Sequence, residues 1–187
     1  MSVIQDVLRI FATGRGQAWD AYDIVPGLDW RQSAPVENPD IADPMARYSR
    51  SGTLLLAGLG PALLPGGPDG DLREGNEGES GITLSGDVAR VHEIAVLKFY
   101  PSDDVAGLLR RQFAPTHSVE PWSHTAAPGG QHSYSIRMDG LPPLRVETFI
   151  DKEGGSSVPG STTFVFYRID PGDEPGETIA EMRCREG

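Results

Sequence analysis

Three histidines are the residues of this chain whose type and spacing come closest to a metal or acid–base site. His117, His124 and His132 fall within one stretch, with Glu120 and Trp122 between them. Zinc sites use imidazole and thiolate ligands, usually in closer pairs than the six and seven intervening residues found here. The spacing therefore favours a surface loop whose tryptophan packs on the core. A metal-dependent or hydrolytic enzyme that uses the three histidines remains the alternative.

The segment from Asp69 to Glu79 is rich in carboxylates, which are the ligands of calcium sites. Calcium prefers several oxygen ligands at alternate positions of a loop with a glycine turn. Counted from Asp69, Arg73 stands at the fifth position and Glu74 replaces the glycine, so a helix–loop–helix site is excluded. We expect a solvated, mobile acidic loop at residues 65–81 that contacts a partner together with the later aromatic loop. The predicted partner-binding residues are Asp69, Asp71, Glu74, Glu77, Glu79, Trp122 and His124.

Other reactive groups lack the context that catalysis needs. The Gly-x-Ser-x-Gly pattern is absent, and Cys184 lies three residues before the last residue. Gly58 and Gly60 follow a strand-like run, but Leu63 replaces the third glycine of a dinucleotide-binding turn. His92 opens a predicted strand, where neighbouring side chains point to opposite faces, so we expect a structural role for it. We predict no catalytic residue, no cofactor and no metal.

The elements that must position these residues begin with a short helix and an aromatic arm. Apolar residues at i, i+3, i+4 and i+7 predict a helix over residues 2–13, with the inner face Ile4, Val7, Leu8 and Phe11. Prolines interrupt residues 15–52, so this arm is expected to wrap the core. Its docking aromatic residues are Trp19, Tyr22, Trp30 and Tyr48.

Strands dominate the rest of the chain. The run 91–100 is apolar on both faces from Ile94 to Leu97, which predicts a central strand. A helix is expected to begin at residue 102, with Val105, Leu108, Leu109 and Phe113 on its inner face. Alternating patterns predict strands over residues 133–138 and 144–150, and apolar residues on both faces predict a strand over 162–169. With a last strand over 178–184, these should form a C-terminal β-meander. Shorter strands are expected over residues 53–57 and 82–84.

This order of elements predicts an α+β fold in one domain, residues 1–187. The sheet is expected to be mainly antiparallel, with a helix packed on one face and long irregular Pro/Gly-rich connections, including residues 114–131. Residues 1–52 form the N-terminal helix and wrapping aromatic arm in this prediction. Residues 82–184 form the sheet core.

The formal net charge of −11 is concentrated in three segments. Residues 20–43 hold six acids and one arginine, residues 66–93 hold seven and two, and residues 170–187 hold six and two. Such an acidic surface repels nucleic acid and attracts basic partners. The single cysteine excludes an intramolecular disulfide, and no apolar run is long enough to span a membrane. We expect a cytoplasmic protein; a chain from which an export signal had been removed would have the same composition.

These observations lead to three functional hypotheses. The first is a non-catalytic, acidic protein-binding module of a bacterial cytoplasmic protein. Its partner would be a protein with a basic surface, which it would neutralise as toxin-neutralising immunity proteins do. The second is the metal-dependent or hydrolytic enzyme described above. The third is a small-ligand-binding module with a pocket between the sheet and the N-terminal arm.

Overall fold

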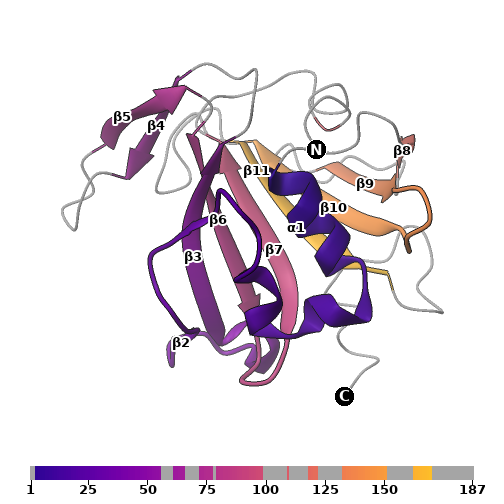
Figure 1. Ribbon diagram of the computed structural model, residues 1–187, viewed down its shortest axis with the longest axis horizontal. Coiled ribbons are helices and arrows are strands. Elements are labelled where there is room, and N and C mark those ends of the chain that lie inside the picture. Colours follow the sequence, from indigo (N-terminus) through magenta and orange to yellow (C-terminus); the bar gives the residue numbers. More distant parts are fainter. Residues whose placement is uncertain are drawn as a thin grey trace.

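The computed structural model describes residues 3–55, 61–65, 72–77, 79–98, 109, 118–121, 132–150 and 162–169. Within these residues the fold combines one α-helix and three short 3-10 helices with a large antiparallel sheet (Figure 1). The helices are α1 (Val3–Phe11), η1 (Gly14–Gln17), η2 (Trp19–Tyr22) and η3 (Pro44–Ala46). The predicted α+β class, with helix on one face of an antiparallel sheet, is confirmed.

Nine of the described strands form one sheet, and two more form a separate antiparallel pair. The order across the sheet is β1-β3-β6-β7-β11-β10-β9-β8, and β2 also pairs with β3. The strands are β1 (Asp29–Trp30), β2 (Val36–Glu37), β3 (Tyr48–Leu55), β4 (Pro61–Pro65), β5 (Leu72–Glu77), β6 (Glu79–Gly86), β7 (Val91–Lys98), β8 (Ser118–Pro121), β9 (His132–Arg137), β10 (Leu144–Ile150) and β11 (Thr162–Arg168). The run β9–β10–β11 confirms the predicted meander, whose last predicted strand, 178–184, lies outside the described residues.

The core lies on one face of this sheet, beneath α1, η1 and η2 (Figure 1). Residues in register across four neighbouring strands form a continuous apolar row: Leu84, Ile94, Phe166 and Val146. Each of them is completely shielded from solvent. β7 lies between β6 and β11, so the prediction that it is a central strand is confirmed.

The N-terminal segment covers this apolar face. α1 buries the inner face that its periodicity predicts: Ile4, Val7, Leu8 and Phe11. Trp19 and Tyr22 on η2 enter the same core, and Trp30 and Tyr48 are half-buried against it. The predicted helix after residue 102 is described only at Leu109, which is helical and fully buried. Its other predicted residues lie outside the described part.

In three places the structure has a strand where irregular backbone was expected. The expected strand over residues 53–57 begins earlier, at Tyr48, and pairs with β6 along its whole length. The expected loop over residues 65–81 contains β5 and the start of β6, because β5 pairs with β4. The expected irregular stretch 114–131 likewise contains β8, which pairs with β9. In each case cross-strand hydrogen bonding stabilises a strand that local composition disfavours.

Candidate functional site

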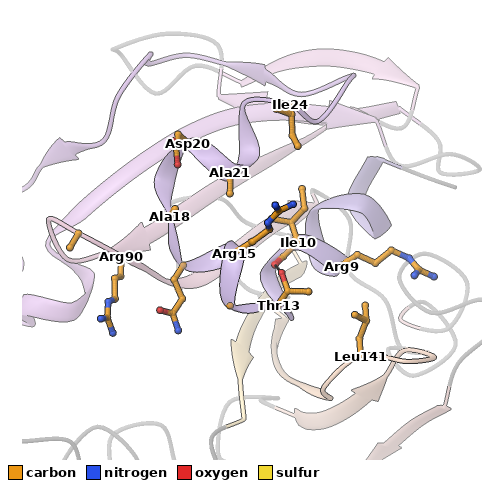
Figure 2. A pocket seen from close by; sticks show the side chains of 13 residues that line it. Arg9, Ile10, Thr13, Arg15, Ala18, Asp20, Ala21, Ile24, Arg90 and Leu141 are labelled. Carbon is orange, nitrogen blue, oxygen red and sulfur yellow. Dashed lines mark hydrogen bonds between the residues drawn. The ribbon is translucent and has the colours of Figure 1, made fainter.

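A cavity of about 810 Å³ opens where the N-terminal helices meet two turns of the sheet (Figure 2). The end of α1, η1 and η2 supply most of its lining, and the β6–β7 and β9–β10 turns supply the rest. Its apolar lining residues are Ile10, Ala18, Ala21, Ile24, Ala89 and Leu141. Its charged lining residues are Arg9, Arg15, Arg90 and Asp20. An apolar surface thus carries three guanidinium groups and one carboxylate.

Short-range hydrogen bonds hold the wall formed by α1, η1 and η2. The Thr13 hydroxyl donates to the carbonyl oxygen of Ile10 at 2.7 Å, which closes the end of α1. The buried Tyr22 hydroxyl donates to the carbonyl oxygen of Gly16 at 2.7 Å, which ties η2 to η1. Burial raises the pKa of the Tyr22 hydroxyl despite the opposing charge of Arg168, so this group stays a donor at neutral pH.

Asp87 organises the opposite wall, which is the β6–β7 turn. Its carboxylate accepts hydrogen bonds from the backbone N–H groups of Ala89 at 2.7 Å and Arg90 at 2.8 Å. It also lies 2.7 Å from the His92 ring nitrogen Nε2. The indole N–H of Trp19 on η2 donates to the Asp87 carbonyl oxygen at 3.1 Å, so the two walls are joined directly. The His92 ring thus contacts the carboxylate that organises this turn, and its structural role stays a prediction.

The Asp87 carboxyl should make folding stability depend on pH. Its partial burial favours a higher pKa, but the hydrogen bonds from His92, Ala89 and Arg90 outweigh this and lower the pKa below its ordinary value. A lowered pKa in the folded state contributes stability above the unfolded-state pKa of about 3.9, and this is lost as pH falls through the folded-state pKa. We expect the stability advantage of the wild type over Asp87→Asn to shrink below about pH 4.

Urea unfolding of both proteins at several pH values between about 3 and 7 measures this difference. Asp40→Asn removes one exposed carboxylate of the N-terminal segment outside this turn and controls for the change in net charge. An advantage of the wild type that stays constant over the whole range would contradict the assignment of Asp87.

The cavity is cationic although the chain is acidic. Within the part of the chain that the structure describes, the side chains of Arg9, Arg15 and Arg90 make no hydrogen bond or ion pair. Other arginines are engaged: Arg50 pairs with Asp23 at 2.5 Å and stacks on the Trp30 ring at 4.5 Å. The cavity arginines therefore keep their hydrogen-bonding capacity for another molecule.

The predicted partner-binding residues do not line this cavity where the structure describes them. Glu74 and Glu77 belong to β5, opposite Leu63 and Pro61 of β4, and Glu79 begins β6. The β4–β5 pair projects beyond the ends of β3 and β6 (Figure 1). Outside the described residues lie Asp69, Asp71, Trp122 and His124. Whether the seven residues form one surface stays a prediction.

The metal-enzyme hypothesis also stays a prediction. His132 begins β9, opposite Thr148, whereas His117 and His124 lie outside the described residues. In the described ranges, no group of three His, Cys, Asp or Glu residues could hold a metal ion. Metal analysis of the purified protein tests the hypothesis. Stoichiometric zinc, manganese or nickel that is lost in a His124→Ala variant would support it.

Sequence reasoning did not identify the cavity residues. Arg9 lies in the predicted helix, Arg15 between two glycines, and Arg90 in a turn some 75 residues later in the chain. Such separated positions form no motif, because only the packing of η1 and η2 beside the β6–β7 turn brings them to one cavity. The one available signal was the expectation of a pocket between the sheet and the N-terminal arm.

No family model, curated protein or solved structure matches this chain. Among the described elements, no helix combines the length and the apolar character that crossing a membrane requires. The chemistry of the cavity and of the exposed acidic residues is therefore the basis for assigning a function.

Proposed function

We propose that this protein is a non-catalytic small-ligand-binding module and that the cavity beside η1 and η2 is its binding site. The observation that carries this proposal is a cavity of about 810 Å³ with a mostly apolar lining and a few polar groups. Ligand sites in proteins typically measure about 300–1,000 Å³ and have this kind of lining. The hydrogen bonds from Tyr22 and Trp19 hold both walls in place without a ligand.

The groups that line the cavity support binding rather than catalysis. A guanidinium group stays protonated at neutral pH and cannot act as a general base. The Thr13 hydroxyl is committed to the Ile10 carbonyl oxygen. The nearby His92 ring contacts the Asp87 carboxylate. The lining therefore offers hydrogen-bond donors, the single carboxylate of Asp20 and apolar contact, but no activated nucleophile.

A thermal-shift screen with metabolites tests the proposal. A ligand present at about 100 times its Kd stabilises the folded state by roughly 2.7 kcal/mol, which raises the Tm of a chain this long by about 5–10 °C. Ala18 is exposed and lines the cavity, so Ala18→Trp should obstruct the site and abolish the shift. Ala42→Trp places the same ring at an exposed position outside the cavity and should keep it. Shifts that survive Ala18→Trp would exclude this cavity as the site.

A second candidate function is the recognition of a basic protein by the acidic arm, which we define as residues 20–43. Five of its six acidic residues are exposed: Asp20, Asp23, Asp29, Glu37 and Asp40. Val36, on the short strand β2 of the same arm, is 53% exposed. The exposed carboxylates would attract a basic partner and Val36 would add apolar contact, and this chain would neutralise that partner.

Capture from a lysate at two salt concentrations tests this second candidate. A partner bound through the arm should be released at about 1 M salt, where charges are screened beyond roughly 3 Å. It should also be lost with Asp29→Asn/Glu37→Gln/Asp40→Asn but kept with Asp139→Asn, an exposed acid outside the arm. Retention of the same basic protein by the triple variant would contradict recognition by the arm.

A further inference from the structure

We infer that the ligand of this cavity is an organic anion: an apolar body that carries a carboxylate or phosphate group. This inference rests on the proposed function, because it assumes that the cavity is the binding site. Its basis is the charge of the lining, where three arginines face one acidic residue in a chain of net charge −11. A cavity that is cationic within an acidic protein selects for the opposite charge.

The arginines come from three separate elements that meet only in the fold. Arg9 belongs to the last turn of α1, Arg15 to η1 and Arg90 to the β6–β7 turn. Figure 2 shows Arg9 and Arg90 on opposite sides of the cavity and Arg15 between them. Asp20, the acid among the lining residues, makes no ion pair with them in the described structure. The cationic field in the cavity is therefore not neutralised by its own lining.

The guanidinium group also defines the kind of anion. Its planar fork of N–H donors matches the two oxygens of a carboxylate or the oxygens of a phosphate, and it is weakly hydrated compared with an ammonium group. Arg15 lies between the other two and is the expected anchor of the anionic group. Arg9 and Arg90 would add attraction from both sides.

The apolar lining requires more than an inorganic ion. Ile10, Ala21 and Leu141 line the cavity, and the Ile24 side chain at its edge is 77% exposed. A ligand with an apolar body would cover Ile24 and remove apolar surface from water. Sulfate or inorganic phosphate would leave this surface exposed, so the arrangement favours an amphiphilic anion.

A matched pair of dyes tests the inference. 8-Anilinonaphthalene-1-sulfonate (ANS) and N-phenyl-1-naphthylamine (NPN) share one aromatic skeleton, and ANS alone carries an anionic group. We expect ANS to bind the wild-type protein at least 10-fold more tightly than NPN, as measured by fluorescence titration. Arg15→Gln should weaken ANS by at least 10-fold and leave NPN unchanged. Arg31→Gln replaces an exposed arginine outside the cavity and should change neither affinity.

Further variants keep the test independent of any one substitution. Arg9→Gln/Arg90→Gln should also reduce the preference for ANS, and thermal melting verifies that each variant is folded. Competition for ANS then compares decanoate, decyl phosphate and decanol. Displacement by decanoate or decyl phosphate at concentrations at least 10-fold lower than decanol supports the inference, and the more effective of the two names the anionic group. Equal displacement by decanol would overturn it.

Failure of the inference and failure of the proposed function give different results. Equal affinities for ANS and NPN, both abolished by Ala18→Trp, would keep the cavity as a ligand site and overturn the anionic preference. Dye binding that Ala18→Trp leaves unchanged would show that the cavity is not the site, and both conclusions would fall. An ANS preference that survives Arg15→Gln and the double variant would also overturn the role of the three arginines.

Discussion

A Gly16→Ala variant is expected to lose about 3 kcal/mol of folding stability. The buried Gly16 packs directly on the end of α1, and a Cβ atom there would lie 2.5 Å from the Phe11 Cα atom and 2.7 Å from the Ile10 carbonyl carbon. These are backbone atoms, which cannot move aside as the end of a flexible side chain can. η1 would have to separate from α1, and the Tyr22 hydrogen bond to the Gly16 carbonyl oxygen would be disturbed with it.

The same substitution should also damage the cavity, because η1 and η2 form its wall. Urea unfolding followed by tryptophan fluorescence measures the stability, and NPN titration measures the cavity. Gly14→Ala is the matched control: Gly14 also belongs to η1, is exposed, and leaves open space around an added Cβ. We expect Gly14→Ala to change stability by less than about 0.5 kcal/mol. Equal effects of the two variants would argue against close packing of η1 on α1.

The elements that sequence analysis located correctly are those whose own pattern suffices to define them. α1 has an apolar stripe that needs only one face to bury, and its burial follows the stripe. β9 and β10 alternate clearly, β11 is apolar on both faces, and the three follow one another in sequence, so their pairing as neighbours could be predicted. β7 has a run of apolar residues that fits a central strand. In all of these, local pattern and tertiary packing agree.

The elements that sequence analysis missed depend on partners far along the chain. On β3, the buried positions include Arg50 and Gly52, and neither residue is one of the large apolar types by which a buried strand is predicted. Arg50 can be buried because Asp23 pairs with it and the Gln32 carbonyl oxygen accepts a hydrogen bond from its Nε at 2.9 Å. Gly52 fits because Trp30 and the Asp29 backbone pack against it, with no room for a Cβ. All of these contacts involve residues outside β3, so the sequence of the strand alone does not predict them.

The cavity could not be predicted for the same physical reason. Its lining depends on how the 3-10 helices fold back on α1, and that geometry follows from the close approach at Gly16 and from the hydrogen bond between Trp19 and Asp87. The composition predicted a different binding surface: acids far outnumber bases, so the acidic segments were expected to contact a partner. A local excess of arginine is visible only once three separate segments are placed together.

Breaking the pair formed by Arg145 and Glu147 on β10 is expected to have the largest effect on stability. The Arg145 Nη2 donates to Glu147 Oε1 at 2.6 Å, and the two residues are only 2% and 7% exposed. Val146 between them points to the core face, so both faces of this strand are buried. Glu147→Leu would remove the Glu147 carboxylate from the buried Arg145 guanidinium, and we expect a loss of about 3–5 kcal/mol.

Arg145→Met/Glu147→Leu distinguishes the cost of removing Glu147 alone from the net contribution of the Arg145–Glu147 pair to stability. Two apolar side chains carry no charge that needs a buried partner, so the double variant should be more stable than Glu147→Leu alone, as measured by urea unfolding.

The pair has a further consequence for the register of β10: a one-residue shift of this strand would bring both charges to the face that α1 covers. The double variant lacks the charges that oppose a shifted register. We therefore expect its NMR spectrum to show broadened or duplicated amide signals from β10. A double variant less stable than Glu147→Leu would show that Arg145 stabilises the fold through other contacts.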